Sequence, residues 1–419
     1  MPAMNSIYRH YPISLLRLAA ALVLIILIAG CSGQADEQGS EPIPSEEPTI
    51  EPVASVQPAN NPTPTDEPTA HPVSTPEVEL LGMVEFKTGY RYGETEVGGL
   101  SGITYNPEEG HYYVLSDDRG GDDPPRFYVV DIDLSDGKLD DGDVIFLDVV
   151  ALLDEEGEQF KAGTIDPESI EYLGPDALYI SSEGNLTAQP LSEPFVAKFK
   201  LSGEKISSLP LPEKFLPDSS GTVGIRDNKA FESLTSTPSG ELLYTALENA
   251  LQQDGTIPTF EKGSPSRLLE FNPSQAKPGR EFVYMVEPIP VSPKQPGYSA
   301  DNGLAELQAL DDGRFLALER SYVEGFGNTV RIFVTNTDGA SEVSSMPSLP
   351  ESAAGETSYT PMGKHLLVDM VDLGIQPDNL EAMAFGPRLP DGRQSLILVS
   401  DNNFNPSQTT QFIVLALNL

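Results

Sequence analysis

The chain has 419 residues, with 25 Lys and Arg against 64 Asp and Glu, and therefore a formal net charge of −39. A surface this anionic repels a phosphate backbone, which excludes nucleic-acid binding. A single cysteine excludes a disulfide framework and a cysteine-based zinc or iron–sulfur site. With 39% hydrophobic residues, the chain has enough apolar side chains for a substantial core.

The amino terminus has the pattern of a lipoprotein signal. Arg9 and Arg17 precede an uncharged apolar run over 18–29, which is too short to span a bilayer but suits the core of a secretory signal. The run leads through Ala-Gly into Cys31 and resembles the bacterial lipobox. We predict a signal peptide over 1–30, lipidation of Cys31, and anchoring to a bacterial membrane on its extracytoplasmic side. An ordinary signal peptide with an incidental cysteine is the alternative.

Residues 31–79 differ sharply in composition from the rest of the chain. The stretch 35–79 contains ten prolines, ten acidic residues and no Lys or Arg. Such a segment cannot bury a core, and we predict a disordered, extended tether. The remaining domain, 80–419, has 23 basic and 54 acidic residues and a net charge of −31.

One pattern recurs five times in this domain: a small or acidic residue, an apolar strand, a turn, a second apolar strand, and another acid. The first positions of the five copies are 67, 64, 74 and 75 residues apart. They are Ser101, Glu168, Glu232, Glu306 and Glu381. Two further alternating segments follow in most copies, for example 127–134 and 144–150. Four antiparallel strands per copy are typical of a β-propeller blade.

The last copy has three strand segments, at about 380–385, 395–400 and 411–417, and one segment, 80–87, precedes the first copy. We therefore predict an all-β fold, a β-propeller of five four-stranded antiparallel blades, with its ring closed by 80–87 as the fourth strand of the last blade. Six blades, or a β-sandwich or barrel, are the alternatives. Residues 241–251 also contain strong helix formers, which competes with the predicted strand there.

The innermost strands of a propeller line its central channel, so the five first positions are expected to form a ring around the axis. Two carboxylates about 8 Å apart repel by about 2 kcal/mol at an effective dielectric of about 20. Such a ring must bind protons, hydrate or hold a cation. Oxygen ligands with almost no imidazole favour calcium. The predicted calcium ligands are Ser101, Glu168, Glu232, Glu306 and Glu381. A calcium that only joins the blades is the alternative to a catalytic one.

A second set of acids ends the following strands, namely Asp118, Glu183, Glu248, Glu319 and Asp401. Basic side chains lie near these acids, and Arg beside metal-bound carboxylates often holds a phosphate or carboxylate. Simple pairing of each basic residue with an acid is the alternative. We predict a ligand-binding set of Arg119, Arg226, Lys229, Asn249, Arg320, Asp401 and Asn402. The candidate catalytic carboxylates are Asp118, Glu232 and Glu248.

Other chemistries lack their residues. The domain has two histidines, His111 and His365, too few for a histidine-rich zinc site. The sequence contains no Gly-x-Ser-x-Gly nucleophile motif and no phosphate-binding glycine loop.

Three stretches, 227–234, 244–249 and 378–404, resemble the bacterial phytase-like domain, also described as esterase-like activity of phytase. The resemblance covers about 95–419 and implies a β-propeller and phosphoester hydrolysis. Propeller phytases have six blades and several calcium ions, whereas five blades are counted here. Residues 115–120 are also similar to the Asp-Asp-Arg-Thr-Gly stretch of the five-bladed calcium-activated apyrase-type nucleotidases. That similarity extends to their central calcium ligands, at Ser101, Glu168, Glu232 and Glu381.

These observations predict a monomeric, lipid-anchored, calcium-binding propeller outside the cytoplasm that hydrolyses a small phosphorylated substrate. The alternative is a non-catalytic surface propeller that binds a ligand or partner and holds a structural central calcium.

Overall fold

The computed structural model describes residues 78–418, except 122, 176, 312 and 350–357. The predicted signal peptide, Cys31 and all but the last two residues of the predicted tether lie outside the described residues. Within this range the chain is all-β apart from two short 3₁₀ helices, η1 (Glu213–Phe215) and η2 (Met370–Leu373). Among the described residues, no helix has the length and apolarity needed to cross a bilayer.

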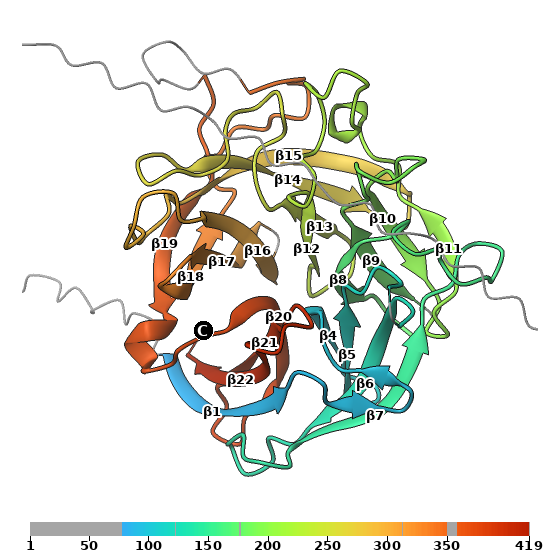
Figure 1. The fold of residues 1–419 in the computed structure, drawn as a ribbon, viewed down its shortest axis with the longest axis vertical. Helices are drawn as coiled ribbons and strands as arrows, with labels where there is room; N and C mark the ends of the chain where they lie inside the picture. Colours follow the sequence, from blue (N-terminus) through green and yellow to red (C-terminus); the bar gives the residue numbers. More distant parts are fainter. Residues whose placement is uncertain (1–77, 122, 176, 312, 350–357, 419) are drawn as a thin grey trace, which may run out of the picture. The chain divides into compact units, whose positions relative to one another are not determined.

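The described strands form five four-stranded antiparallel sheets around a central axis (Figure 1). Blade 1 consists of β4 (Leu100–Asn106), β5 (His111–Ser116), β6 (Arg126–Ile132) and β7 (Val144–Ala151). Blade 2 consists of β8 (Pro167–Tyr172), β9 (Leu178–Ser182), β10 (Phe195–Phe199) and β11 (Lys205–Ser208). Blade 3 consists of β12 (Phe231–Ser236), β13 (Leu243–Leu247), β14 (Ser264–Asn272) and β15 (Lys277–Val286). Blade 4 consists of β16 (Ala300–Asp311), β17 (Arg314–Val323), β18 (Gly327–Asn336) and β19 (Gly363–Asp369).

Blade 5 joins the two ends of the described chain. Its strands are β20 (Asn379–Arg388), β21 (Gln394–Asp401), β22 (Thr409–Leu417) and β1 (Val78–Lys87), and β1 pairs with β22. This confirms the predicted five blades and their closure by the first strand, and it excludes six blades and a sandwich. A small hairpin, β2 (Arg91–Tyr92) with β3 (Thr95–Glu96), lies between β1 and blade 1.

The hydrophobic core lies between neighbouring blades. Inner strands are buried on both faces, as in β22, where eight of nine residues are buried, because each blade packs against one on either side. The outer strand β7 instead alternates between buried and exposed residues at its start. Leu115 and Phe127 of blade 1, for example, share a cluster with Ile180 of blade 2.

The segment 241–251 contains strand β13, although its residues include strong helix formers. β13 pairs with β12 on one side and β14 on the other. Pairing and burial on both edges outweigh helix propensity, which amounts to less than about 1 kcal/mol per residue.

Each innermost strand has a β-bulge near its start. The register shifts lie between Leu100 and Gly102, Pro167 and Ile170, Phe231 and Ser233, Leu304 and Glu306, and Leu380 and Ala382. A bulge leaves its extra residue outside the ladder and bends the strand. The five bulges therefore decide which side chain each blade presents at this end of the axis.

Candidate functional site

A cavity of about 880 Å³ opens where the innermost strands begin. Acidic side chains from four blades contribute to its wall near the axis: Asp117, Glu168, Glu232, Glu381 and Asp401. In blades 1, 2, 3 and 5 these acids lie at the start of the innermost strand or at the end of the second strand. Residues of blade 4 complete the wall of the cavity.

The bulge residues are Ser101, Glu168, Glu232, Ala305 and Glu381, with Ser169 also unpaired in blade 2. Four of the five predicted ring positions are therefore equivalent. In blade 4 the equivalent residue is Ala305, because Glu306 pairs in register with Leu318. The predicted equivalence of Glu306 was wrong by one residue, since a local pattern does not show where a strand places its extra residue.

Glu306 lies instead across the channel between blades. Its carboxylate accepts hydrogen bonds from Ser169 Oγ at 2.7 Å and from the Leu234 backbone N–H at 3.1 Å. The residue is 1% exposed, and burial raises its pKa well above the usual range although these hydrogen bonds oppose the shift. Glu306 joins blades 2, 3 and 4 and is not among the described residues that line the cavity.

Ser101 is not among the described residues that line the cavity, unlike Glu168, Glu232 and Glu381. Its hydroxyl group donates to the Pro167 carbonyl oxygen at 3.4 Å and so joins blade 1 to blade 2.

The second strands present an equivalent column at their ends. In each blade, the residue just before the bulge pairs with a residue of the second strand, and the column residue is the next one along the chain. The five column residues are Asp117, Glu183, Glu248, Arg320 and Asp401. Glu183, Glu248 and Asp401 were predicted for this column, whereas Asp118 and Glu319 are each one residue away from it. Blade 4 thus contributes Arg320 where the other four blades contribute an acid, and Ala305 where blades 2, 3 and 5 contribute a glutamate.

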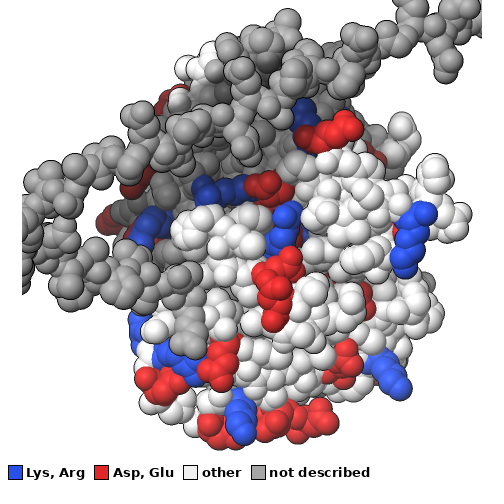
Figure 2. Space-filling model, turned by 90° about the vertical axis from the view of Figure 1, so that its left-hand side faces the viewer, with Lys and Arg blue, Asp and Glu red and all other residues white. Residues whose placement is uncertain are grey.

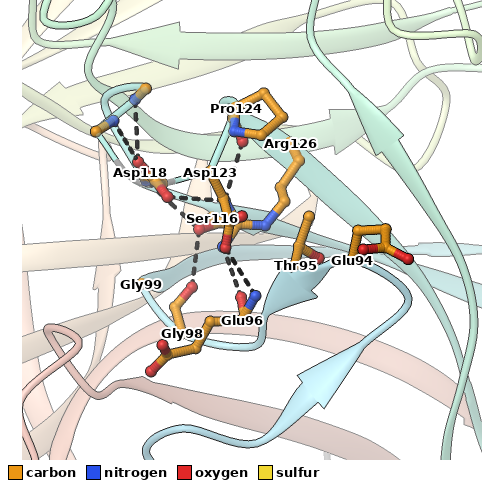
Figure 3. A network of polar contacts seen from close by, with 12 residues as sticks. Glu94, Thr95, Glu96, Gly98, Gly99, Ser116, Asp118, Asp123, Pro124 and Arg126 are labelled. Carbon is orange, nitrogen blue, oxygen red and sulfur yellow. Dashed lines mark hydrogen bonds and ion pairs between the residues drawn. The ribbon is translucent and has the colours of Figure 1, made fainter. Parts of the chain in front are cut away.

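Asp118 points toward a buried arginine (Figure 3). Its Oδ2 accepts from Arg126 Nη1 at 2.9 Å, and its Oδ1 accepts from the backbone N–H groups of Gly120 and Gly121 at 3.0 and 3.1 Å. Arg126 also donates to the Glu96 carbonyl oxygen at 2.6 Å. Asp118 therefore neutralises a cation inside blade 1, and its placement outside the cavity does not support the predicted catalytic role.

Glu319 is likewise a structural acid. It is fully buried, and its carboxylate accepts from Lys364 Nζ at 2.7 Å, Tyr284 Oη at 2.8 Å and Asn302 Nδ2 at 2.9 Å. These contacts join blades 3 and 4 beside the cavity.

Arg320 brings a positive charge into the carboxylate ring. Its Nη2 lies 2.8 Å from Glu381 Oε1 and 3.9 Å from Glu248 Oε1, and its Nη1 lies 3.5 Å from Asp301 Oδ1. Burial lowers the pKa of Arg320, but these acids outweigh burial and raise it. The half of the ring contributed by blades 3, 4 and 5 is therefore already partly neutralised.

The buried carboxylates around the cavity have unfavourable charged forms. Burial raises the pKa of Glu168, Glu183 and Glu232 well above the usual range, and neighbouring carboxylates add to the shift. Burial, with a contribution from Glu381, raises the pKa of Asp401 to about 7. Without a bound cation, these groups are stabilised by binding protons.

A cluster of three buried acids in blade 2 fits a hard cation. One carboxylate oxygen from each of Asp166, Glu168 and Glu183 lies within 4.8 Å of the other two. Glu183 Oε2 is buried and has no hydrogen-bond partner among the described residues. Oxygen-only donors with an unpartnered oxygen suit calcium. Arg119 borders the cluster, with its Nε 2.6 Å from Asp166 Oδ1.

The remaining predicted ligand residues divide into two groups. Lys229 lies near the axis, with its Nζ 3.0 Å from Glu248 Oε2. The Arg226 side chain donates hydrogen bonds to the backbone carbonyl oxygens of residues 250 and 255. The Asn249 side chain donates to the Asn302 carbonyl oxygen. Asn402 Oδ1 accepts hydrogen bonds from the backbone N–H groups of residues 99 and 404. Arg226, Asn249 and Asn402 thus support the backbone and are not among the described residues that line the cavity.

The sequence pattern missed several residues of the site. Asp117 is adjacent in sequence to the predicted Asp118, and only the register of the paired strands distinguishes the two. Asp166 lies two residues before the predicted Glu168, just ahead of strand β8. Tyr322 and Asn328 also line the cavity and come from the second hairpin of blade 4, which carried no motif.

Charged side chains away from the cavity are intermixed. On the face shown in Figure 2, acidic and basic side chains of the described residues lie beside one another in small groups, without an extended field of one sign. Exposed pairs of this kind contribute about 0–1 kcal/mol each. The axial acids are therefore distinguished by burial and not by the bulk charge of the chain.

A propeller with a carboxylate-rich axial cavity is the class of protein that this fold and site define. The sequence profile of the phytase-like family, described as esterase-like activity of phytase, matches residues 95–404. This match covers most of the chain, which belongs to the phytase-like family, as the sequence motifs predicted.

Other similarities are weaker. An uncharacterized secreted protein of Arthroderma benhamiae is 24% identical over 177 residues, which are 35% of this chain and 34% of that protein. The periplasmic gluconolactonase PpgL of Pseudomonas aeruginosa is similar with a TM-score of 0.30 and 13% identity, over 75% of this chain and 84% of that one. The tail fiber of Staphylococcus aureus phage P68 is similar with a TM-score of 0.36 and 11% identity, over 82% and 53%.

Proposed function

We propose that the chain is a calcium-dependent phosphoric ester hydrolase that acts on a small phosphorylated substrate in the axial cavity. One observation carries the proposal: a carboxylate cluster that suits a cation reaches the cavity through Glu168, and two arginines that suit phosphate oxygens, Arg119 and Arg320, line the same cavity.

Asp166, Glu168 and Glu183 would hold the calcium ion. Bound calcium would supply positive charge that polarises the phosphoryl group. The unpartnered Glu183 Oε2 and the raised pKa values of Glu168 and Glu183 support a cation there, because an ion would compensate the buried negative charge.

Arg119 and Arg320 would bind the phosphoryl oxygens. Both side chains line the cavity, and they are 42% and 13% exposed, so a ligand can reach them. A guanidinium group donates two parallel hydrogen bonds to a phosphate and stabilises the negative charge of the transition state.

Glu232 is suited to orient the attacking water. Its carboxyl group lines the cavity at 8% exposure, and no described residue forms a hydrogen bond or ion pair with it. The water oxygen forms the new P–O bond while the ester P–O bond breaks, and the proton taken from water by Glu232 is returned to the leaving alcohol.

The test is phosphate release from p-nitrophenyl phosphate, ATP and phytate, each with calcium and with a chelator. We expect turnover that the chelator abolishes and that Glu232→Gln reduces by about 10²–10⁴-fold. Arg314→Gln, at an exposed position on the same strand as Arg320, is the control and should retain activity. Absence of chelator-sensitive turnover on all three substrates would reject the enzyme.

A non-catalytic propeller that binds a ligand at its surface and holds a structural calcium is the second candidate. Arg320 favours it, because its ion pairs with Glu248 and Glu381 already join blades 3, 4 and 5 at the axis. Under this alternative, calcium raises the melting temperature although no substrate is turned over.

We further propose that the protein acts outside the cytoplasm, anchored through a lipidated Cys31 and the tether. The lipobox pattern supports the anchor. The secreted relative from Arthroderma benhamiae supports export in general and says nothing of a lipid.

A further inference from the structure

The cavity extends beyond the charged axis over blades 4 and 5. Within blade 5 its lining residues come from all four strands: Glu381 on β20, Asp401 on β21, Gln411 on β22 and Glu85 on β1. We call the part lined by blades 4 and 5 away from the axis the outer arm. With a volume of about 880 Å³, the whole cavity has room for a substrate larger than a single phosphate group.

Amide side chains dominate the lining of the outer arm. They are Asn328, Gln376, Asn403, Asn405, Gln408 and Gln411. Each amide group offers both donors and acceptors, which matches the dual character of a hydroxyl group.

Several of these amides have free hydrogen-bonding capacity. Asn328 is only 9% exposed, and neither its side chain nor those of Gln376 and Asn403 form a hydrogen bond with a described residue. The Gln408 side chain donates through its Nε2 to Asp378 Oδ1 at 3.0 Å, and its side-chain Oε1 has no partner among the described residues. These side-chain amides can therefore form hydrogen bonds with water or with a ligand in the cavity.

An aromatic ring lies beside Asn328. Tyr322 and Asn328 are directly opposite on the antiparallel strands β17 and β18, so their side chains share one face, and both line the cavity. Tyr322 is 39% exposed, which leaves ring surface available for a ligand. A ring beside an amide can stack on the C–H face of a sugar while the amide binds its hydroxyl groups.

The charge of the outer arm excludes a second phosphate group. The cationic side chains among the described lining residues are Arg119 and Arg320, both near the axial acids. The outer arm instead carries the acids Glu85 and Asp378. A phosphate placed there would meet carboxylates without a compensating cation.

From this arrangement, we infer that the outer arm binds a neutral polyhydroxylated ring, a sugar or cyclitol, and that the substrate carries a single phosphate group. The claim that the substrate carries a single phosphate group rests on the proposed function. The claim that the outer arm binds the ring rests on Tyr322, Asn328 and the neighbouring amides alone.

Saturation-transfer NMR with methyl α-D-glucopyranoside and myo-inositol tests the ring end directly. We expect ring-proton signals with the wild-type protein that are lost in Tyr322→Ala and in Asn328→Ala. Phe326→Ala is the matched control, because Phe326 is 48% exposed in the adjacent turn and is not among the described lining residues. Signals that survive both cavity variants, or no signal with the wild type, would overturn the inference.

Calorimetry in calcium adds the phosphate end. Glucose 1-phosphate should bind about tenfold more tightly than inorganic phosphate. Tyr322→Ala and Asn328→Ala should each remove this difference in affinity. Myo-inositol hexakisphosphate should bind no more tightly than inorganic phosphate. Tighter binding of the hexakisphosphate would overturn the inference. If the sugar signals appear but no ester is hydrolysed, the proposed function fails, whereas the binding of a neutral polyhydroxylated ring by the outer arm stands.

Discussion

Replacement of Arg320 by Gln tests the account of the axial charges most directly. Glutamine retains hydrogen-bonding ability and most of the length of the side chain but removes the charge. The change leaves Glu381, Glu248 and Asp301 without their shared cation. We expect the free energy of unfolding to fall, because a buried carboxylate that loses its partner remains desolvated.

The magnitude follows from the closest contact. At 2.8 Å and an effective dielectric of about 20, the pair of Arg320 with Glu381 has a Coulomb energy of about 6 kcal/mol. The gain from no longer burying the guanidinium and the uptake of protons by the acids offset part of this value, and broken buried pairs typically cost about 3–5 kcal/mol. We expect a loss of about 3 kcal/mol at pH 8, which corresponds to about 4 °C for a domain of roughly 340 residues.

The loss should depend on pH in a defined direction. Burial raises the pKa of Glu381 in the folded protein, and Arg320 opposes the shift, so removal of Arg320 raises this pKa further. Below about pH 4 the folded and unfolded states both hold the proton, and the cost is absent. As the pH rises through the raised pKa, the unfolded state ionises freely while the folded state must ionise a buried group. The loss should therefore be smaller at pH 5 than at pH 8.

The assay is thermal and denaturant unfolding in chelator at both pH values, with Arg314→Gln as the control. Arg314 is 59% exposed and pairs with Asp311 at the surface, so its replacement should cost less than about 1 kcal/mol. Calcium should restore part of the stability of the Arg320 variant, because the acids freed from Arg320 can share a cation. Equal losses for the two variants at pH 8, or an Arg320 loss as large at pH 5 as at pH 8, would refute the reasoning.

Three further predictions concern the acids and the amino terminus. Glu183→Gln should reduce the rise in melting temperature on calcium addition by at least half, as measured by calorimetry, and an unchanged rise would remove Glu183 from the cation site. Glu306→Gln should stabilise the protein relative to wild type at pH 8 but not at pH 5. The reason is that the pKa of Glu306 is raised, so that its ionised form costs free energy only as the pH rises. Chemical denaturation at both pH values measures the effect, and a lower free energy of unfolding for the variant at pH 8 contradicts it. Cys31→Ser should move the protein from the membrane fraction to the soluble fraction and remove the lipid mass, whereas membrane retention would argue against lipidation.

Much of the architecture could be predicted from the sequence. Strand periodicity and turn residues are local, so the five repeats and the leftover first strand were enough to predict five blades and their closure. The columns of acids were predicted equally well in blade 5, where Glu381 and Asp401 occupy the expected positions.

Three of the errors in the site occur at register positions. Asp118, Glu306 and Glu319 each lie one residue from the column to which they were assigned. Side chains alternate along a strand, so a shift of one residue moves a carboxylate from the cavity to a buried ion pair or to the channel. The sequence pattern offered two adjacent acids at 117 and 118 and no local reason to prefer one.

By itself, the sequence determined the number of blades and the presence of acids from several blades near the axis. Only the tertiary structure decided that blade 4 supplies Arg320 where the other blades supply an acid, and Ala305 where blades 2, 3 and 5 supply a glutamate. It also decided that three acids of blade 2 form the cluster that suits a cation. The reason is physical: periodicity depends on neighbours along the chain, whereas bulges and ion pairs depend on pairing between strands, and those pairings form only in the folded ring.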